Sequence, residues 1–309
     1  MKRRKFLQKA ITGSVLLAAG AFPYEALARG DVKKITILHT NDQHSRIEPF
    51  PMDGGKYQGL GGFAERAAVI NNIRSQEKNV LLLDSGDIWQ GTPYFNKYKG
   101  ELEFMLMSEM GYAASTLGNH DFDAGVEGLA KQLPRARFPF LNCNYDFTDT
   151  ALQGKIETHR VFLLDGVRIG VFGVGIELQG LVPPKLFEGV RYNDPIACAN
   201  RTAAMLRHDY RCHLVICLSH LGYKYDDKKV SDMDLAYRSE NIDLILGGHT
   251  HTFLHHPEEY ANASGKKVII NQVGWAGIYL GRIDFYFERE NRKKLLPEAP
   301  VLIRSSELQ

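Results

Sequence analysis

The sequence contains little cysteine, with four residues in a chain of 309. So few thiols exclude the disulfide-dense scaffold of a small secreted domain. Two of them lie in or beside strand-like runs, which predicts buried thiols. The sequence leaves open whether one bridge forms in an oxidising compartment. The four positions are Cys143, Cys198, Cys212 and Cys217, and the two predicted to be buried are Cys143 and Cys217.

The chain also lacks an apolar run long enough to cross a bilayer, which takes about 20 residues. Its N-terminal apolar run, Ile11 to Phe22, follows a basic start and precedes the small-x-small pattern Ala26-Leu27-Ala28. This order predicts a secretory signal over residues 1–28 and a single folded domain over residues 29–309.

The signal has a further feature, the pair Arg3-Arg4 ahead of Phe6-Leu7. The pair resembles a twin-arginine signal, which exports proteins that are already folded. The alternative is an ordinary signal that happens to carry two arginines. Both predict an exported protein, in the periplasm or the extracellular space. The absence of cysteine near Ala28 argues against a lipoprotein.

An excess of one charge is missing as well. The whole chain carries a net charge of +2, and residues 1–28 hold five basic residues against one acidic residue, so their removal leaves −2. Without clusters of Lys and Arg, the sequence predicts no nucleic-acid surface. The run from Arg289 to Lys294 mixes both signs and predicts a solvated tail. The sequence has no internal repeat and no low-complexity linker.

What the chain does have is an alternation of strand-like and helical patterns. Helical spacing of apolar residues is present in Phe63–Arg74, Leu102–Met110, Val126–Leu133 and Ala197–Arg207. Near the end, Lys267–Val273 and Ile278–Phe287 predict a half-buried antiparallel pair. This order predicts an α/β fold of mixed sheets packed face to face with helices outside. The other predicted strands are Lys34–His39, Val80–Leu83, Ala114–Leu117, Phe138–Asn142, Val167–Val174, His213–Leu218 and Ile242–Leu246.

Five short polar stretches follow apolar runs, where a strand would end and a loop begin. Together they contain carboxylates, an amide and imidazoles, with no thiolate. This mix suits two borderline-hard divalent ions, and paired ions favour hydrolysis of a phosphate ester or a related bond. The stretches are Asp42-Gln43-His44, Gly86-Asp87, Gly118-Asn119-His120-Asp121, His220 and Gly247-Gly248-His249-Thr250-His251.

The first two stretches offer specific ligands. Asp42 and His44 are two apart, so in extended geometry both side chains point to one side and could grip one ion. Gly86 permits a tight turn that lifts Asp87 over its strand end, where one carboxylate could bridge two metals. Asp84 is the other candidate for this bridging carboxylate, and we expect it to support the loop instead.

The third stretch is the most specific. Asn119 offers a neutral carbonyl ligand. His120 cannot easily share that metal, because neighbouring side chains diverge, and is better used to contact substrate and protonate the leaving group. Asp123 could orient this imidazole and raise its pKa. The alternative for a bare Asn-His is a turn.

The last stretches add imidazoles at strand ends. His249 and His251 are two apart, but the loop could turn them to different ions. The other histidines lack this context, and we expect them to serve surface or core packing. They are His159, His208, His213, His255 and His256. His39 lies inside the first predicted strand, and we expect a structural role for it.

These stretches resemble the motifs of the calcineurin-like metallophosphoesterases, specifically the catalytic domain of the 5′-nucleotidase family. The matching segments include the longer runs Leu38–His44, Asp84–Asp87 and Ser219-His220. The resemblance covers about residues 34 to 287 and implies a four-layer α/β/β/α fold. It implies one metal held by Asp42, His44, Asp87 and His251, and a second held by Asp87, Asn119, His220 and His249. It also implies a catalytic dyad of His120 and Asp123. At position 121 this chain has Asp where the family motif commonly has Glu.

The resemblance further implies a dinuclear-metal phosphohydrolase that cleaves nucleotide esters with metal-bound water or hydroxide, and the N-terminal signal predicts that it is exported. The ions could be Mn, Zn, Fe or Co. Alternative substrates are a 2′,3′-cyclic phosphodiester, a UDP-sugar or a sulfur ester. Family members usually continue into a C-terminal domain that binds the base, and this sequence ends at Gln309. A catalytic subunit that needs a separate base-binding partner protein is therefore another alternative, and an inactive metal-binding module is the last.

One aromatic cluster near Asp87 has two interpretations. It could line a pocket for the leaving group, or it could pack a loop against the helix at Leu102. The cluster consists of Trp89, Tyr94, Phe95 and Tyr98.

Overall fold

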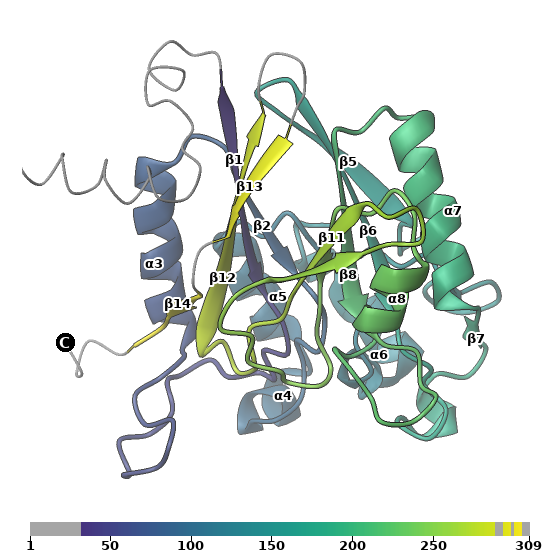
Figure 1. Ribbon diagram of the computed structural model, residues 1–309. Helices are drawn as coiled ribbons and strands as arrows, with labels where there is room; N and C mark the ends of the chain where they lie inside the picture. Colours follow the sequence, from purple (N-terminus) through teal and green to yellow (C-terminus); the bar gives the residue numbers. More distant parts are fainter. Residues whose placement is uncertain (1–31, 288–292, 298–299, 305–309) are drawn as a thin grey trace, which may run out of the picture.

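The computed structural model describes residues 32–287, 293–297 and 300–304 (Figure 1). The predicted signal over residues 1–28 lies outside these ranges. Within them, no helix is both long and apolar enough to cross a membrane. All four cysteines are free thiols, and Cys143 is only half-buried whereas the other three are buried.

The first sheet has six strands in the order β13-β12-β1-β2-β3, with β14 pairing to β12. β1 pairs parallel with β2 and antiparallel with β12, so the sheet is mixed. Its parallel strands place their carboxyl ends along one edge. The bounds are β1 Lys33–Thr40, β2 Val80–Asp84, β3 Ala114–Ser115, β12 Tyr279–Phe287, β13 Lys293–Pro297 and β14 Val301–Leu302.

The second sheet also has six strands, in the order β10-β11-β9-β8-β6-β5. Its four central strands run parallel, and antiparallel neighbours lie on both sides. The bounds are β5 His159–Leu164, β6 Val167–Gly175, β8 Leu214–His220, β9 Leu244–Leu246, β10 Glu258–Ala261 and β11 Lys267–Asn271. A small separate pair joins β4 Tyr145–Asp146 to β7 Arg191–Tyr192.

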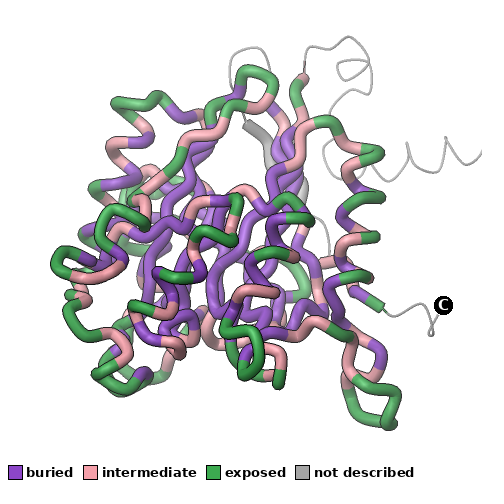
Figure 2. The backbone as a smooth tube through the Cα atoms, turned by 180° about the vertical axis from the view of Figure 1, so that it is seen from behind, coloured by how far each residue is buried: buried purple, intermediate pink, exposed green. Residues whose placement is uncertain are grey.

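Three groups of buried apolar side chains define four layers. One group lies between the sheets, where Ile35 and Ile37 of β1 meet Val171 of β6 and Ile216 of β8. A second lies between the first sheet and helices α3 (Phe63–Gln76) and α5 (Glu101–Glu109). A third lies between the second sheet and helices α7 (Pro195–His208) and α8 (Asp232–Arg238). Figure 2 shows the buried strands inside and the exposed outer faces of the helices. The predicted four-layer α/β/β/α fold is confirmed.

The predicted elements differ from the structure in a few places. Lys267–Val273 and Ile278–Phe287 do not pair with each other, because β11 joins β9 and β10 while β12 joins β1 in the other sheet. Phe138–Asn142 makes only isolated bridges. The remaining helices of the described ranges are α4 Pro93–Tyr98 and α6 Gly125–Gln132, with short 3-10 turns at His120–Phe122, Leu133–Arg135 and Pro184–Leu186.

Candidate two-metal site

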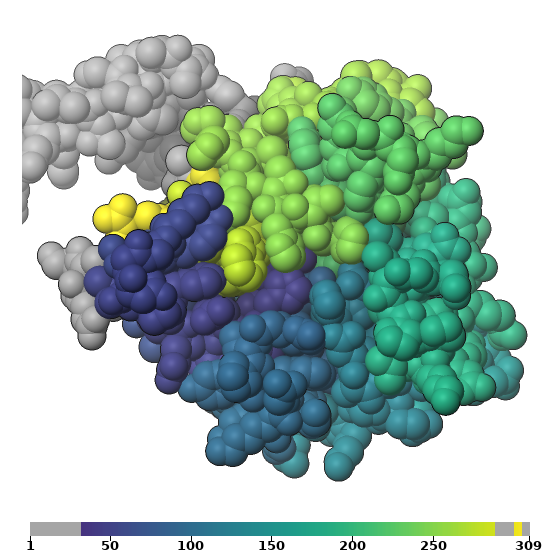
Figure 3. Space-filling view, turned by 90° about the horizontal axis from the view of Figure 1, so that it is seen from below, coloured from purple at the N-terminus to yellow at the C-terminus, as the bar shows by residue number. Residues whose placement is uncertain are grey.

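The five polar stretches meet at one edge of the sandwich, where β1, β2, β3, β8 and β9 end. Figure 3 shows the face at this end, with N-terminal and C-terminal segments side by side on it. The seven predicted ligands fall into two triads plus Asn119. The triads are Asp42, His44 and His251, and Asp87, His220 and His249, and the ligand atoms of each lie within 4.8 Å of one another.

The first triad is tightly gathered. His44 Nε2 lies 2.9 Å from His251 Nε2. Asp42 Oδ1 lies 3.4 Å from His251 Nε2 and 4.0 Å from His44 Nε2. These separations fit ligands of one ion, because metal–ligand bonds of about 2.0–2.2 Å place neighbouring ligand atoms about 3 Å apart.

The second triad sits beside the first. Asp87 Oδ2 lies 3.2 Å from His220 Nε2. Asn119 joins this group through its Oδ1, which lies 2.8 Å from His249 Nδ1. Asp87 Oδ2 also lies 3.9 Å from His44 Nε2, so the same oxygen faces both triads.

The chemistry of these groups fits bound cations. His220 Nε2 is buried and has no hydrogen-bond partner among the described residues. Its other nitrogen, Nδ1, donates to the Ser85 carbonyl at 2.7 Å, which fixes the ring and leaves Nε2 facing the carboxylates. Buried polar atoms normally have a partner, and a cation between the triads would provide one.

The electrostatics of the site also fit bound cations. Burial lowers the pKa of His44, and burial together with the neighbouring His220 lowers the pKa of His249 to about 4. Both therefore favour the neutral imidazole, which is the form that binds metals. Burial also opposes charge on His220, but the adjacent Asp87 raises its pKa to about 10. The buried carboxylates thus favour positive charge at the centre of the site.

The backbone of the site is unusual. Five of the seven candidate ligands have positive φ, between 48° and 71°. The expectation that Asp42 and His44 share an extended strand geometry is therefore wrong, since their φ values are 50° and 48°. The left-handed turns, and not strand alternation, bring both side chains to one place. Such backbone is costly for non-glycine residues and gathers at functional sites.

Glycine makes room at one point. A Cβ on Gly248 would lie 2.9 Å from His220 Nδ1 and 3.1 Å from Asp42 Oδ2. The residue therefore lets the β9 loop approach ligands from two other strands. The same loop turns His251 toward the first triad and His249 toward the second.

Two buried carboxylates hold the ligand loops from behind. Asp84 accepts hydrogen bonds from Thr40, Gln43, Ser115 and the Gly86 backbone at 2.6–3.0 Å, which confirms the prediction that it supports the loop. Sequence reasoning missed the second. Asp121 accepts backbone N–H bonds at 2.8–3.3 Å from Gly118 and from Asp87, Ile88 and Trp89.

His120 and Asp123 lie beside the triads. His120 Nδ1 is 2.8 Å from Asp123 Oδ2, and the hydrogen bond raises the pKa of the imidazole. The His120 ring lies edge-on to that of His44, with centroids 5.3 Å apart. Its side chain is 38% exposed, so the ring is partly open to solvent beside the triads. The backbone N–H of His120 donates to Asp87 Oδ1 at 2.8 Å, which ties the pair to the second triad.

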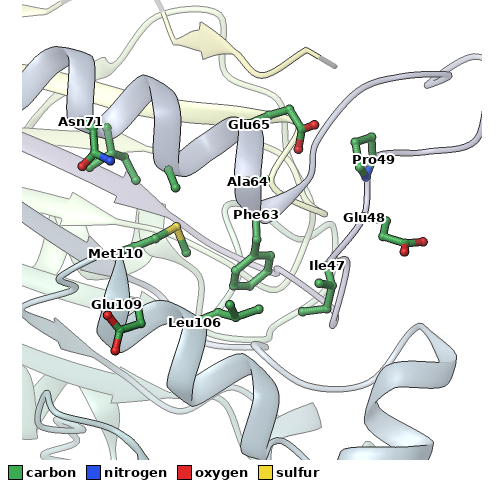
Figure 4. A pocket seen from close by; sticks show the side chains of 12 residues that line it. Ile47, Glu48, Pro49, Phe63, Ala64, Glu65, Asn71, Leu106, Glu109 and Met110 are labelled. Carbon is green, nitrogen blue, oxygen red and sulfur yellow. The ribbon is translucent and has the colours of Figure 1, made fainter. Parts of the chain in front are cut away.

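Two cavities lie near this region. One of about 540 Å³ borders the dyad and is lined by Asp123, Lys99, Lys131 and Arg135 among others. The other, about 410 Å³, lies between α3 and α5 (Figure 4). Its lining residues, which include Phe63, Leu106 and Met110, contain none of the seven candidate ligands. We therefore place the chemistry at the strand ends and not in this apolar cleft.

The aromatic cluster after Asp87 belongs mainly to the core. Trp89 is fully buried and stacks on Phe104, with ring centroids 5.0 Å apart. Phe95 packs on Trp89 at 5.6 Å. Loop packing against the helix is thus the correct interpretation, and the leaving-group pocket is wrong for these two rings. A different aromatic group, which includes Trp275 against His251, was not found from the sequence.

Comparisons with known proteins agree with this geometry. A model of the calcineurin-like phosphoesterase family matches residues 35–253. A snake venom 5′-nucleotidase from Naja atra is 31% identical over 294 residues, which cover 88% of this chain and 54% of the relative. The chain therefore spans about half the length of the curated relatives it matches.

Solved structures give the same result. The 5′-nucleotidase precursor from Thermus thermophilus has a TM-score of 0.78 and 30% identity, over 88% of this chain and 55% of that one. The NAD nucleotidase of Haemophilus influenzae has a TM-score of 0.78 and 27% identity, over 89% of this chain and 51% of that one.

Proposed function

The chain belongs to the calcineurin-like phosphoesterase family, a family of metal-dependent phosphoester hydrolases, and we propose that it hydrolyses nucleotide phosphate esters at a dinuclear centre. The observation that carries this proposal is the pair of triads facing the common Asp87 oxygen, with the His120–Asp123 dyad beside them. In its relatives the activity belongs to chains about twice as long.

The proposed ligands form two sets. Asp42, His44, Asp87 and His251 would hold one ion. Asp87, Asn119, His220 and His249 would hold the other. Divalent ions bound there would supply an acidified water and would neutralise charge that develops on the phosphoryl oxygens. The metal could be Mn, Zn, Fe or Co, since all accept carboxylate, amide and imidazole ligands.

The chain itself would supply positioning and proton transfer. Asp123 holds Nδ1 of His120, so Nε2 is the nitrogen that would donate a proton to the leaving-group oxygen. The cavity lined by Asp123 borders the dyad, and Lys99 and Lys131 on its wall would attract the negative charge of an approaching substrate. Arg135 on the same wall pairs with Glu101 at 3.1 Å.

The substrate is proposed from the names of the relatives described above, which are nucleotidases. The alternative substrates remain a 2′,3′-cyclic phosphodiester and a UDP-sugar. Because this chain spans about half of its relatives, a separate protein that binds the base is a further proposal. We also propose that residues 1–28 are a twin-arginine export signal ahead of one catalytic domain, which N-terminal sequencing of the exported protein would test.

The test of function is phosphate release by protein loaded with Mn or Zn. The substrates are AMP, UDP-glucose, 2′,3′-cyclic AMP and bis-p-nitrophenyl phosphate. We expect turnover of AMP, and loss of about 10²–10⁴-fold in kcat for His120→Ala with both metals retained. The matched control is His159→Ala, whose imidazole packs on Tyr210 away from the triads. Two bound metals with no turnover of any ester would reject the proposal.

A further inference from the structure

Four aromatic side chains gather beside the first triad. They come from the loop before α3 and from the loops after β9 and β11. None is buried, in contrast to Trp89, the other tryptophan of the chain. We call this group the aromatic patch, and it consists of Phe50, Tyr57, Phe253 and Trp275.

The patch is continuous with the candidate metal site. The Trp275 ring stacks on that of His251, with centroids 5.5 Å apart and planes within 5°. It also lies edge-on to His44, 6.4 Å away. A substrate whose phosphate reached this triad would therefore have the patch next to it.

The other rings extend from Trp275 in a chain. Tyr57 lies edge-on to Trp275, with centroids 6.1 Å apart. Tyr57 and Phe253 are nearly parallel, at 21° and 6.4 Å. Phe50 lies edge-on to Trp275 at 5.7 Å, and the Arg46 guanidinium covers the Phe50 ring at 4.2 Å. Tyr57 thus contacts all three of the other rings, and the Arg46 guanidinium covers Phe50.

The backbone holds the patch in place. Asn41, the neighbour of Asp42, donates to the Gly274 carbonyl at 2.5 Å and accepts from the Val273 N–H at 3.0 Å. The Ala276 N–H donates to the Asp42 carbonyl at 2.7 Å. The loop that carries Trp275 is therefore fixed to the loop that carries the first ligand, so the patch is preorganised.

Glycine also brings the rings together. Gly274 has φ +78°, and a Cβ there would lie 2.1 Å from the Phe253 ring. Its absence lets Phe253 pack directly on this backbone. In the loop before α3, the backbone N–H of Phe50 donates a hydrogen bond of 2.9 Å to the Leu60 carbonyl, which closes the loop.

We propose that the aromatic patch binds a flat ring in the leaving group of the substrate, such as a nucleobase, by stacking. Partly exposed, preorganised aromatics suit this role because every base has a face that can stack, whatever its edge. The proposal rests on the proposed function, and it gives the catalytic domain a ring-binding subsite of its own. It predicts a preference for aromatic leaving groups without selectivity among bases.

The kinetic test compares AMP with ribose 5-phosphate, which has the same ester but no base. We expect Tyr57→Leu and Trp275→Leu to raise KM for AMP about tenfold and to leave ribose 5-phosphate unchanged. Trp275→Phe should retain most of the affinity. Tyr237→Leu, an exposed tyrosine on α8, is the matched control. Metal content, measured in each variant, shows whether His251 still binds.

Equal losses on both esters would overturn the proposal, because Trp275 would then only position His251. Tyr57 is useful here, since its ring contacts Trp275 and Phe253 instead of a candidate ligand. Unchanged kinetics in both leucine variants would also overturn it.

A second readout does not depend on turnover. Trp89 is buried and Trp275 is partly exposed, so AMP should quench the fluorescence of the metal-loaded protein while ribose 5-phosphate should not. The quenching should disappear in Trp275→Phe. If no ester is hydrolysed but AMP still quenches, the proposed function fails and the ring site stands. Absence of base-dependent quenching would reject the ring site itself.

Discussion

Arg66 Nη2 donates a hydrogen bond to Gln43 Oε1 at 2.5 Å, deep behind the candidate metal site. Gln43 lies between two predicted ligands, Asp42 and His44, and its Nε2 donates to Asp84 at 2.8 Å. Arg66 is fully buried on α3. A side chain of the outer helix layer therefore fixes the turn that carries Asp42 and His44, through a residue that is not itself a candidate ligand.

We expect Gln43→Leu to destabilise the protein by about 3 kcal/mol, because it leaves the buried Arg66 charge and the Asp84 carboxylate without this partner. Metal binding should weaken as well, since the turn loses its support. Urea unfolding and a Mn titration measure the two effects. Gln58→Leu is the control, because Gln58 makes its hydrogen bond at the surface, and should change stability by less than about 0.5 kcal/mol. Equal effects of the two changes would contradict the role of Gln43.

Asp121→Ala should be still more damaging. The substitution removes the acceptor of four backbone N–H groups around Asp87, and each buried donor left unpaired costs about 1–3 kcal/mol. Thermal unfolding should show a large drop in Tm, and metal content should fall with it. Asp53→Ala removes an exposed acceptor of one backbone N–H and should have little effect. A Tm like that of the Asp53 variant would show that the Asp87 loop does not need Asp121.

Gly248→Ala tests the fit of the ligands without removing any. Its Cβ would press on His220 and on the Ser85 carbonyl, 3.0 Å away, so we expect lower affinity for metal with the fold intact. Calorimetric titration with Zn measures the affinity, and circular dichroism shows whether the fold is intact. Gly55→Ala serves as control, because its Cβ would meet only the flexible Asp53 side chain. Wild-type affinity in the Gly248 variant would mean that the loop can shift at no cost.

Asp232 predicts a pH dependence of stability. Burial raises the pKa of Asp232 to about 8, against the weaker opposing effect of its hydrogen bond from Ser219. The folded protein then keeps a proton that the unfolded chain releases near pH 4. Stability from this group is present below pH 4 and is lost as the pH rises to 8, by up to about 1.4 kcal/mol per unit. Denaturation of metal-free protein at pH 5 and pH 8 should show the loss, and Asp232→Asn should lack it. An equal loss in both proteins would assign it to other groups.

The sequence predicted the layers and the cluster of candidate ligands because both follow from simple rules. Apolar runs mark the strands, and polar residues that follow them meet at the edge of a parallel sheet. Asp42, Asp87 and His220 became candidates in this way, and the structure brings them together. The pairing of β11 and β12 was wrong because their partners, β9 and β1, are far away in the sequence, and alternation says nothing about which strand a neighbour joins.

Other features have no sequence pattern at all. Asp121 and Gln43 act through backbone and side-chain hydrogen bonds that depend on the assembled loops. The positive φ of His249 and His251 could not be predicted from the sequence, because only a few per cent of non-glycine residues adopt it and no local pattern marks them. Trp275 is an isolated aromatic in the sequence, and only the fold places its loop, which precedes β12, beside Asp42.

Each candidate triad takes its residues from both sheets. Asp42 and His44 follow β1, and His251 follows β9 of the other sheet; Asp87 follows β2, whereas His220 ends β8. A bound ion would therefore cross-link the two halves of the sandwich. The two sheets could not slide over their shared core without pulling a ligand away. Metal loading and slow hydrogen exchange in the central strands should rise and fall together, so that losing the ions loosens the halves of the molecule as well as its chemistry.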